Sequence, residues 1–255
     1  MNFAGKCVLV TGAGAGIGRA ACIAFAKSGA KVAVNSLNRS PSQSGEDTVD
    51  IIRSSGGEAT FIMGDVSVPD QAERIVREAY EAMGRIDILV NNAGVVIPGR
   101  VDTIPVEMFD ITMSVNVRGT FLMSKYVVPY MKSQGGGVIV NIASVAALKG
   151  HTDRSAYCAS KGAVVALSRA MAADYVGDNI RVNCVCPGTT MTPAIEEKIR
   201  TAADPKAMEE AFVERQPLMR LAKVEEIAHA VLFACCDEAA YMDGSLIVID
   251  GGMSM

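Results

Sequence analysis

The sequence contains no tryptophan, only two histidines and no long uninterrupted apolar run. Its 255 residues hold 24 Lys plus Arg against 28 Asp plus Glu, which gives a net charge of −4. A nucleic-acid-binding domain would show a basic excess, and a membrane-spanning helix would need about 18 or more consecutive apolar residues. We therefore expect neither nucleic acid nor a membrane as a partner. Because residues 1–6 lead straight into an apolar run, with no room for a signal peptide, we expect a cytoplasmic protein.

The cysteines follow no metal-binding or disulfide pattern. Seven of them are scattered along the chain, mostly within apolar segments, and no two are spaced as Cys-x-x-Cys. Two histidines are too few to complete a metal site with them. We expect no bound metal, and we expect the cysteines to be buried, reduced thiols.

Short apolar runs alternate with longer amphipathic segments through the whole chain. Most of the short runs are continuous in Val, Ile and Leu, which is typical of parallel strands that are covered on both faces. The expected strands are residues 6–11, 31–36, 59–64, 87–91, 137–143, 181–186 and 246–250. The expected helices are residues 17–29, 46–55, 69–83, 109–133, 154–176 and 224–235.

This repeated order predicts an α/β fold, a doubly wound Rossmann-type sheet of about seven parallel strands with helices on both faces. No linker interrupts the pattern, so residues 1–255 are expected to form one domain for dinucleotide binding and catalysis. The most irregular stretch is 188–216, which contains Pro193, Pro205 and several charges. We expect an insertion there that covers the substrate and is mobile, because long irregular segments in compact domains are often lids.

A glycine-rich turn follows the first expected strand and opens the first expected helix. Gly12, Gly16 and Gly18 would allow a tight turn and a close approach of the backbone to a pyrophosphate, beside the free N–H groups of the helix N-terminus. The spacing is not a strict Gly-x-Gly-x-x-Gly, because Ile17 interrupts it. A tight strand–helix turn without a ligand is the alternative.

The end of the second expected strand bears on the choice of dinucleotide. NAD-binding sites usually carry an acidic residue there, on the adenosine ribose, whereas this chain has Asn35 and Ser36, followed by Arg39. Asn35 and Ser36 could donate hydrogen bonds to a 2′-phosphate and Arg39 could supply positive charge. The pattern favours NADP(H), with NAD(H) possible if Arg39 is only a solvated loop residue.

Tyr157 and Lys161 form a candidate acid–base pair. They stand four residues apart in an expected helix and so share one face. A nearby ammonium lowers the pKa of a phenol, as a general acid or base at neutral pH requires. Ser144 ends the fifth expected strand, at the edge where open α/β sheets bind ligands, and its hydroxyl could hydrogen-bond a substrate oxygen.

With this pair, the sequence resembles the short-chain dehydrogenase/reductase family. The resemblance is carried by an ordered set of motifs that spans the chain: Gly12/Gly16/Gly18, Asp65-Val66, Asn91-Asn92-Ala93-Gly94, Asn116, Ser144, Tyr157/Lys161, Pro187-Gly188 and Asp250-Gly251-Gly252. It is closest to the branch with 3-oxoacyl-(acyl carrier protein) reductases and other carbonyl reductases. The resemblance implies that the catalytic residues are Asn116, Ser144, Tyr157 and Lys161. The implied cofactor contacts are Gly12, Gly16, Ile17, Gly18, Ser36, Arg39, Asp65, Val66, Asn92, Ala93, Gly94, Tyr157, Lys161, Pro187, Gly188 and Thr192.

The resemblance also implies individual roles. Lys161 would hold the nicotinamide ribose, Asn116 would link a water chain to Lys161, Asp65 would contact adenine and Thr192 the carboxamide. Structural alternatives stay open: a polar kink in the helix for Asn116, a turn for Asp65 and a plain loop residue for Thr192. His151 and Arg154 precede Tyr157 and could face the substrate, but we expect them to be solvated loop residues.

A homotetramer is also implied. The expected helices 109–133 and 154–176 give it independent support, because they carry apolar residues around much of their circumference: Val115, Val117, Phe121, Leu122, Val164, Val165, Leu167 and Met171. The alternative is that both helices are sandwiched within one subunit.

The predicted function is an NADP(H)-dependent oxidoreductase that interconverts a secondary alcohol and a ketone, with a small molecule as its substrate. The alternatives are an NAD(H)-dependent enzyme of the same family and a non-catalytic dinucleotide sensor. A sensor would not need Tyr157 and Lys161, so their presence argues against it.

Overall fold

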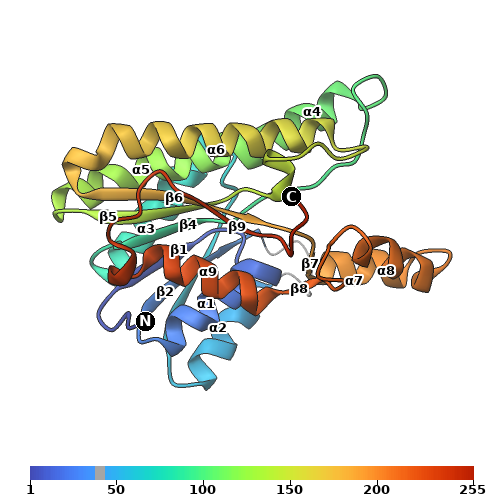
Figure 1. Cartoon of the computed structure of the whole chain (residues 1–255). Coiled ribbons are helices and arrows are strands. Elements are labelled where there is room, and N and C mark those ends of the chain that lie inside the picture. Colours follow the sequence, from blue (N-terminus) through green and yellow to red (C-terminus); the bar gives the residue numbers. More distant parts are fainter. Residues whose placement is uncertain (38–43) are drawn as a thin grey trace.

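The computed structural model describes residues 1–37 and 44–255, so Arg39 lies outside the described residues. A seven-stranded parallel sheet forms the centre, in the order β3-β2-β1-β4-β5-β6-β9 (Figure 1). Its strands are β1 Cys7–Val10, β2 Lys31–Ser36, β3 Glu58–Met63, β4 Ile88–Asn91, β5 Gly137–Ile142, β6 Ile180–Pro187 and β9 Leu246–Ile249. All seven expected strands are confirmed, within one residue at each end, and so is the single-domain Rossmann-type α/β fold.

Helices cover both faces of the sheet, as expected (Figure 1). One layer holds α1 Gly16–Lys27, α2 Gly45–Ser54 and α9 Val224–Cys235. The opposite layer holds α3 Pro69–Met83, α5 Gly119–Ser133 and α6 Ser155–Tyr175. Each layer buries its own apolar cluster against the sheet, with Phe25 and Val231 in the first and Ile75 and Met123 in the second. This double coverage explains why the strands are continuously apolar.

The strand order reverses at β1, which lies between β2 and β4. Val8 of β1 is in register with Val32 on one side and with Ile88 on the other. The connections after β1 and β4 therefore diverge to opposite sides, which leaves a crevice beyond the carboxyl ends of these strands.

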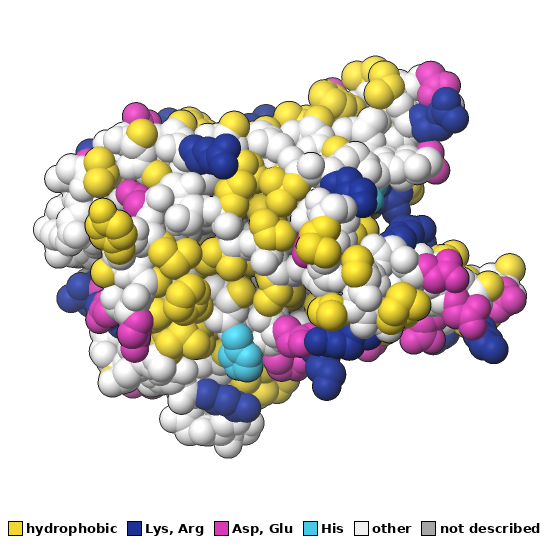
Figure 2. Space-filling model, viewed as in Figure 1, with side chains coloured by type: hydrophobic (Ala, Val, Ile, Leu, Met, Phe, Trp, Pro, Cys, Tyr) yellow, Lys and Arg dark blue, Asp and Glu magenta, His cyan; other side chains and the backbone are white. Residues whose placement is uncertain are grey.

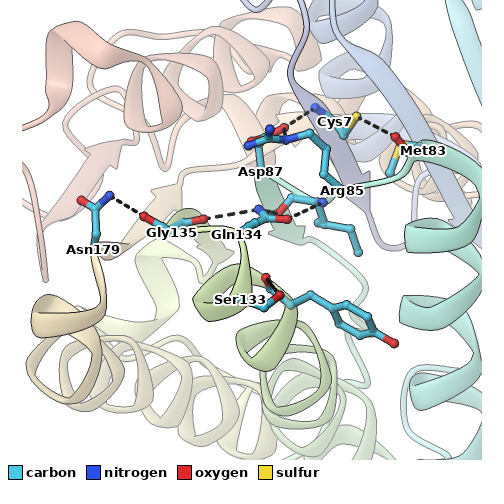
Figure 3. Close-up of polar contacts among 11 residues, drawn as sticks. Cys7, Met83, Arg85, Asp87, Ser133, Gln134, Gly135 and Asn179 are labelled. Atoms are coloured by element: carbon cyan, nitrogen blue, oxygen red, sulfur yellow. Dashed lines mark hydrogen bonds and ion pairs between the residues drawn. The ribbon is translucent and has the colours of Figure 1, made fainter.

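The opposite, amino end of the sheet is held together by polar side chains (Figure 3). The buried Asp87 carboxylate accepts a hydrogen bond from Cys7 N at 2.8 Å and forms an ion pair with Arg85 at 2.6 Å. Gln134, which follows α5, donates to Ile86 O at 2.6 Å and accepts from Ile86 N at 3.3 Å. These contacts fix the starts of β1 and β4 and leave the carboxyl ends for the ligand site.

Two segments differ from the expected elements. The single helix expected over 109–133 is divided into α4 Val106–Met113, a π-helical turn Ser114–Arg118, and α5. The expected irregular segment 188–216 contains two short helices, α7 Pro193–Arg200 and α8 Pro205–Val213, which project beside the carboxyl end of the sheet (Figure 1). A two-stranded pair, β7 Thr190–Met191 with β8 Ala222–Lys223, closes the base of this projection.

Within residues 1–37 and 44–255, no helix is both long and apolar enough to cross a membrane. In the same described part of the chain, no group of three His, Cys, Asp or Glu side chains is arranged to hold a metal ion. All seven cysteines are described, and all are free; six of them are buried.

Candidate active site

One cavity of about 780 Å³ runs along the carboxyl ends of the strands. Gly12 and Ser36 line one end of it, and Ser144, Tyr157 and Lys161 line the other. Most of the expected site residues line this cavity: Gly12, Gly16, Ile17, Ser36, Asp65, Val66, Asn92, Ala93, Gly94, Ser144, Tyr157, Lys161, Pro187, Gly188 and Thr192. Gly18 and Asn116 do not line the cavity; they lie behind its wall.

The glycine-rich turn brings backbone to the cavity. Gly12 has φ +61°, and a Cβ there would lie only 2.7 Å from the Cα of Ala93, so a larger residue would be both strained and obstructed. Gly18 is buried, and its Cβ would meet the Asn92 side chain at 2.5 Å. The α1 helix starts at Gly16 with neither a side-chain cap nor an acidic residue in its first turn. Its N–H groups are thus available to an anion in the cavity.

The Asn92 side chain holds the turn in place. Its amide donates to the backbone carbonyls of Thr11 and Gly12, both at 3.0 Å. The Thr11 hydroxyl in turn accepts from the backbone N–H groups of Asn92 and Ala93, at 3.0 and 3.1 Å. The side chain of Asn92 is therefore structural, and the backbone of this strand end is what faces the cavity.

The end of β2 departs in part from the expectation. Asn35 is buried, and its amide nitrogen donates to the carbonyls of Ile62 and Gly64, both at 3.1 Å. Both amide hydrogens are thus used within the sheet, and the expectation that Asn35 binds a phosphate is wrong. Ser36 lines the cavity. The Asp65 carboxylate also lines it, but it accepts from Ser67 N and Oγ at 2.9 and 2.7 Å, which is the turn arrangement left open above.

Tyr157 and Lys161 lie on the same face of α6, as their spacing predicts. The Lys161 ammonium is 5.8 Å from the centre of the Tyr157 ring and donates to Ile142 O at 2.7 Å. Burial lowers the pKa of Lys161 to about 8. Burial raises the pKa of Tyr157, and an interaction with the Ser144 hydroxyl opposes that rise. The pKa of Tyr157 is thus raised and not lowered as expected, because burial outweighs the opposing interactions, and the Lys161 ammonium donates to a backbone carbonyl.

Asn116 sits in the π-helical turn, behind the cavity wall. Its side chain accepts from Val95 N at 2.8 Å and donates to Val95 O at 3.0 Å. It also donates to the Ser160 hydroxyl at 2.9 Å, which in turn donates to Tyr157 O at 2.8 Å. The extra residue of the π turn therefore turns Asn116 inward, where it joins the strand-end loop to the first turns of α6.

The remaining residues complete the walls. Gly188 lies against the backbone of Asp250, with a hypothetical Cβ 2.7 Å from its Cα. Thr192 lines the cavity and also caps α7, since its side chain accepts from Ile195 N. His151 and Arg154 also line the cavity, so the expectation that they are only solvated loop residues is wrong. Arg215 is a further lining residue that the sequence reasoning missed, because only the path of the 188–216 segment brings it there.

The comparisons with known proteins agree with this geometry. A family model described as "Enoyl-(Acyl carrier protein) reductase" matches residues 12–254. An uncharacterized oxidoreductase of Thermotoga maritima is 52% identical over 252 residues, which is 99% of this chain and 98% of that protein. The chain belongs to the short-chain dehydrogenase/reductase family. Family members are oxidoreductases that act on CH–OH groups with NAD(P), and this chain is one of them.

Other relatives cover nearly the whole chain. The 3-oxoacyl-[acyl-carrier-protein] reductase FabG of Thermotoga maritima is 36% identical, over 99% of both proteins. Dehydrogenase/reductase SDR family member 6 of Aquarana catesbeiana is 40% identical, over 98% of both. Among solved structures, levodione reductase superposes with a TM-score of 0.93 at 34% identity, over 99% of both chains.

Proposed function

We propose that this protein interconverts a secondary alcohol and a ketone with NADP(H), and that Tyr157 is the general acid–base. The observation that carries the proposal is the convergence of Ser144, Tyr157 and Lys161 on one end of a cavity whose other end is the glycine-rich turn. A ligand that reached both ends would be an extended dinucleotide with its reactive ring beside a phenol. A non-catalytic sensor would not need this pair of side chains.

The cavity fits a dinucleotide cofactor on its own geometry. The absence of side chains at Gly12 and Gly16 leaves backbone and the uncapped start of α1 facing the cavity, where a pyrophosphate would be held. Ser36, Asp65 and Val66 would border the adenosine, whereas Gly94, Lys161, Pro187, Gly188 and Thr192 would border the nicotinamide half. The cofactor would supply the hydride acceptor or donor.

The chain's own residues would handle the proton. In the reducing direction the phenol of Tyr157 would give its proton to the carbonyl oxygen as negative charge develops there. The Ser144 hydroxyl would hydrogen-bond the same oxygen and stabilise that charge. A Lys161 ammonium would favour the phenolate left on Tyr157. Asn116 would act as a positioning residue, because it fixes Val95 and Ser160 rather than touching the cavity.

The preference for NADP(H) rests on Ser36 and on Arg39, which lies outside the described residues. Ser36→Asp would place a carboxylate beside a 2′-phosphate, and we expect it to lower kcat/KM for NADPH by about 10-fold or more while NADH is affected less. Steady-state rates with ketones and with both cofactors, followed at the nicotinamide absorbance, test this. A wild-type enzyme that already prefers NADH would contradict the cofactor assignment but leave the acid–base proposal intact.

We also propose that the protein acts in the cytoplasm as a homotetramer. The seven free thiols are consistent with a reducing compartment. Apolar side chains stay exposed on α4 and α5, including Val106, Ile111 and Phe121, and such surfaces are often covered by subunit contacts.

A further inference from the structure

Cationic side chains reach the end of the cavity that holds Ser144, Tyr157 and Lys161, which we call the substrate end. They come from two separate parts of the chain. His151 and Arg154 come from the loop that leads into α6, and Arg215 follows α8 on the projecting segment. Lys198 of α7 stands beside Arg215, because both cations lie over the Phe212 ring, at 5.5 and 5.3 Å from its centre. Figure 2 shows a notch in the surface between the α4 side of the molecule and the α7–α8 projection, with Lys and Arg side chains beside it.

These charges have no anionic partner within the described chain. Over residues 1–37 and 44–255, none of Arg154, Lys198 and Arg215 forms an ion pair with an Asp or Glu. The only carboxylate among the described residues that line the cavity is Asp65, whose partner is Ser67 at the adenosine end. The substrate end is therefore electropositive and uncompensated, in a protein whose net charge is −4.

The cations are also close enough to repel one another. Burial together with the charges of Arg154 and Arg215 lowers the pKa of Lys198. Burial together with Lys149, Arg215 and Arg154 lowers the pKa of His151. In addition, Nε2 of His151 is buried and has no hydrogen-bond partner in the described structure. An arrangement that crowds like charges and leaves a buried polar atom unpaired is stabilised by an anion that enters between them.

From this cluster we infer that the substrate is a short hydroxy or oxo acid, whose carboxylate is bound between Arg154 and Arg215 with Lys198 and His151 beside them. The inference rests on the proposed function, since it assigns the substrate class of the same site. Arg154 directly precedes the first turn of α6 and Tyr157 lies in it, about 5 Å apart along the helix axis. The carboxylate and the reacting carbon are thus only a few carbons apart. Because Arg215 and Lys198 are on the projecting segment, the anion would also draw that segment toward α6.

The test compares acids with their neutral esters. Straight-chain hydroxy acids of three to five carbons, each with its methyl ester, are assayed as substrates with NAD⁺ and with NADP⁺. We expect at least one acid to exceed its ester roughly 10-fold or more in kcat/KM, mostly through KM. Arg215→Met should lower kcat/KM for that acid by about 10- to 100-fold, as expected for a lost charge-assisted hydrogen bond, and change the ester rate less than about threefold. Arg154→Met should behave in the same way.

Arg77→Met is the matched control, because Arg77 is an exposed residue of α3 whose one ion pair among residues 1–37 and 44–255 is with Glu81. It removes one positive charge from the protein, and neither rate should change. Esters that equal or exceed their acids would overturn the inference, and so would an Arg215→Met variant that slows acid and ester equally. Phosphate monoesters of matched alcohols that outperform the acids would overturn the choice of a carboxylate.

A failure of the proposed function would be recognised separately. If no alcohol, ketone, acid or ester were turned over with either cofactor, the proposed alcohol–ketone interconversion would fail. The anion site would still be tested by thermal unfolding in butyrate, which has no hydroxyl to react. Butyrate should raise the Tm of the wild type and of Arg77→Met but not that of Arg215→Met, and an equal rise in all three would contradict the inference.

Discussion

The buried charge of Lys161 should lower the free energy of unfolding of the protein. Lys161 is 5% exposed as a residue, and its ammonium has no carboxylate partner among the described residues. Its pKa falls from 10.5 to about 8. A fall from 10.5 to 8 corresponds to about 3 kcal/mol, at roughly 1.4 kcal/mol for each pH unit. Lys161→Met removes this penalty and also the hydrogen bond to Ile142 O, which contributes about 1 kcal/mol. At pH 7 the variant should therefore be more stable than the wild type by about 2 kcal/mol, or roughly 4–8 °C in Tm.

The pH dependence identifies the cause. Since the folded pKa of Lys161 is lower than the unfolded one, the unfolded chain binds more protons between pH 8 and 10.5, and the wild type gains stability across that range. This gain in stability is complete above pH 10.5, and it is lost as the pH falls through the folded pKa of about 8. The advantage of Lys161→Met should shrink from pH 8 upward and become a deficit of about 1 kcal/mol near pH 10.5.

Urea unfolding at pH 7, 8, 9 and 10 measures this difference, and subtraction of the two proteins removes all other titrating groups. Lys27→Met, at the exposed end of α1, is the control and should differ from the wild type by an amount that does not change with pH. A stability difference between Lys161→Met and wild type that stays constant from pH 7 to 10 would refute the reasoning.

Three further outcomes are expected. Gly12→Ala should lower the free energy of unfolding by about 2 kcal/mol or more and weaken cofactor binding, because its Cβ would press on Ala93. The control Gly84→Ala has a similar φ of +77° but no atom within 4 Å of its Cβ, and it should cost only about 1 kcal/mol. Equal losses of stability in the two variants would contradict the close approach of Gly12 to Ala93. Hydrogen exchange in 188–216 should slow when cofactor and substrate bind, and equally strong protection in the free enzyme would exclude a lid. Light scattering should give about four times the chain mass of 26.8 kDa, and an active species at 26.8 kDa would rule out the tetramer.

The strand pattern could be predicted because burial on both faces leaves a plain signal in the sequence. The break in the expected helix 109–133 could not be predicted, because a π turn adds only a single residue and leaves both flanking helices amphipathic. In the sequence, Pro193 and Pro205 predict irregular structure. In the structure they follow the capping residues Thr192 and Asp204 and begin α7 and α8, where proline is well tolerated.

Chemistry-bearing residues were easier to predict than their surroundings. The spacing of Tyr157 and Lys161 fixes their common face, but the effect of burial on both pKa values depends on side chains from other elements. Asn35 illustrates the same limit, since its amide is used by carbonyls of the neighbouring β3 region. The approach of Arg215 to Arg154 depends on the tertiary path of the projecting segment, which no local pattern encodes.

Burial within the subunit explains part of the apolar circumference of the long helices. Leu122, Val164, Val165 and Met171 are buried within the subunit, as the sandwiched alternative predicted. Phe121 stays 48% exposed on α5. The sequence could not separate the buried residues from the exposed one, because both kinds are apolar residues of the same helices.

The most direct test of the account is the turnover of Tyr157→Phe, compared with its binding of NADPH. The substitution removes one oxygen from a ring at the cavity wall, so nucleotide affinity should stay within about threefold of the wild type. The rate of ketone reduction should fall by roughly 10²–10⁴-fold, the usual contribution of a general acid. A variant that binds NADPH normally and keeps more than about a tenth of the wild-type kcat would contradict the assignment of Tyr157 as the proton donor.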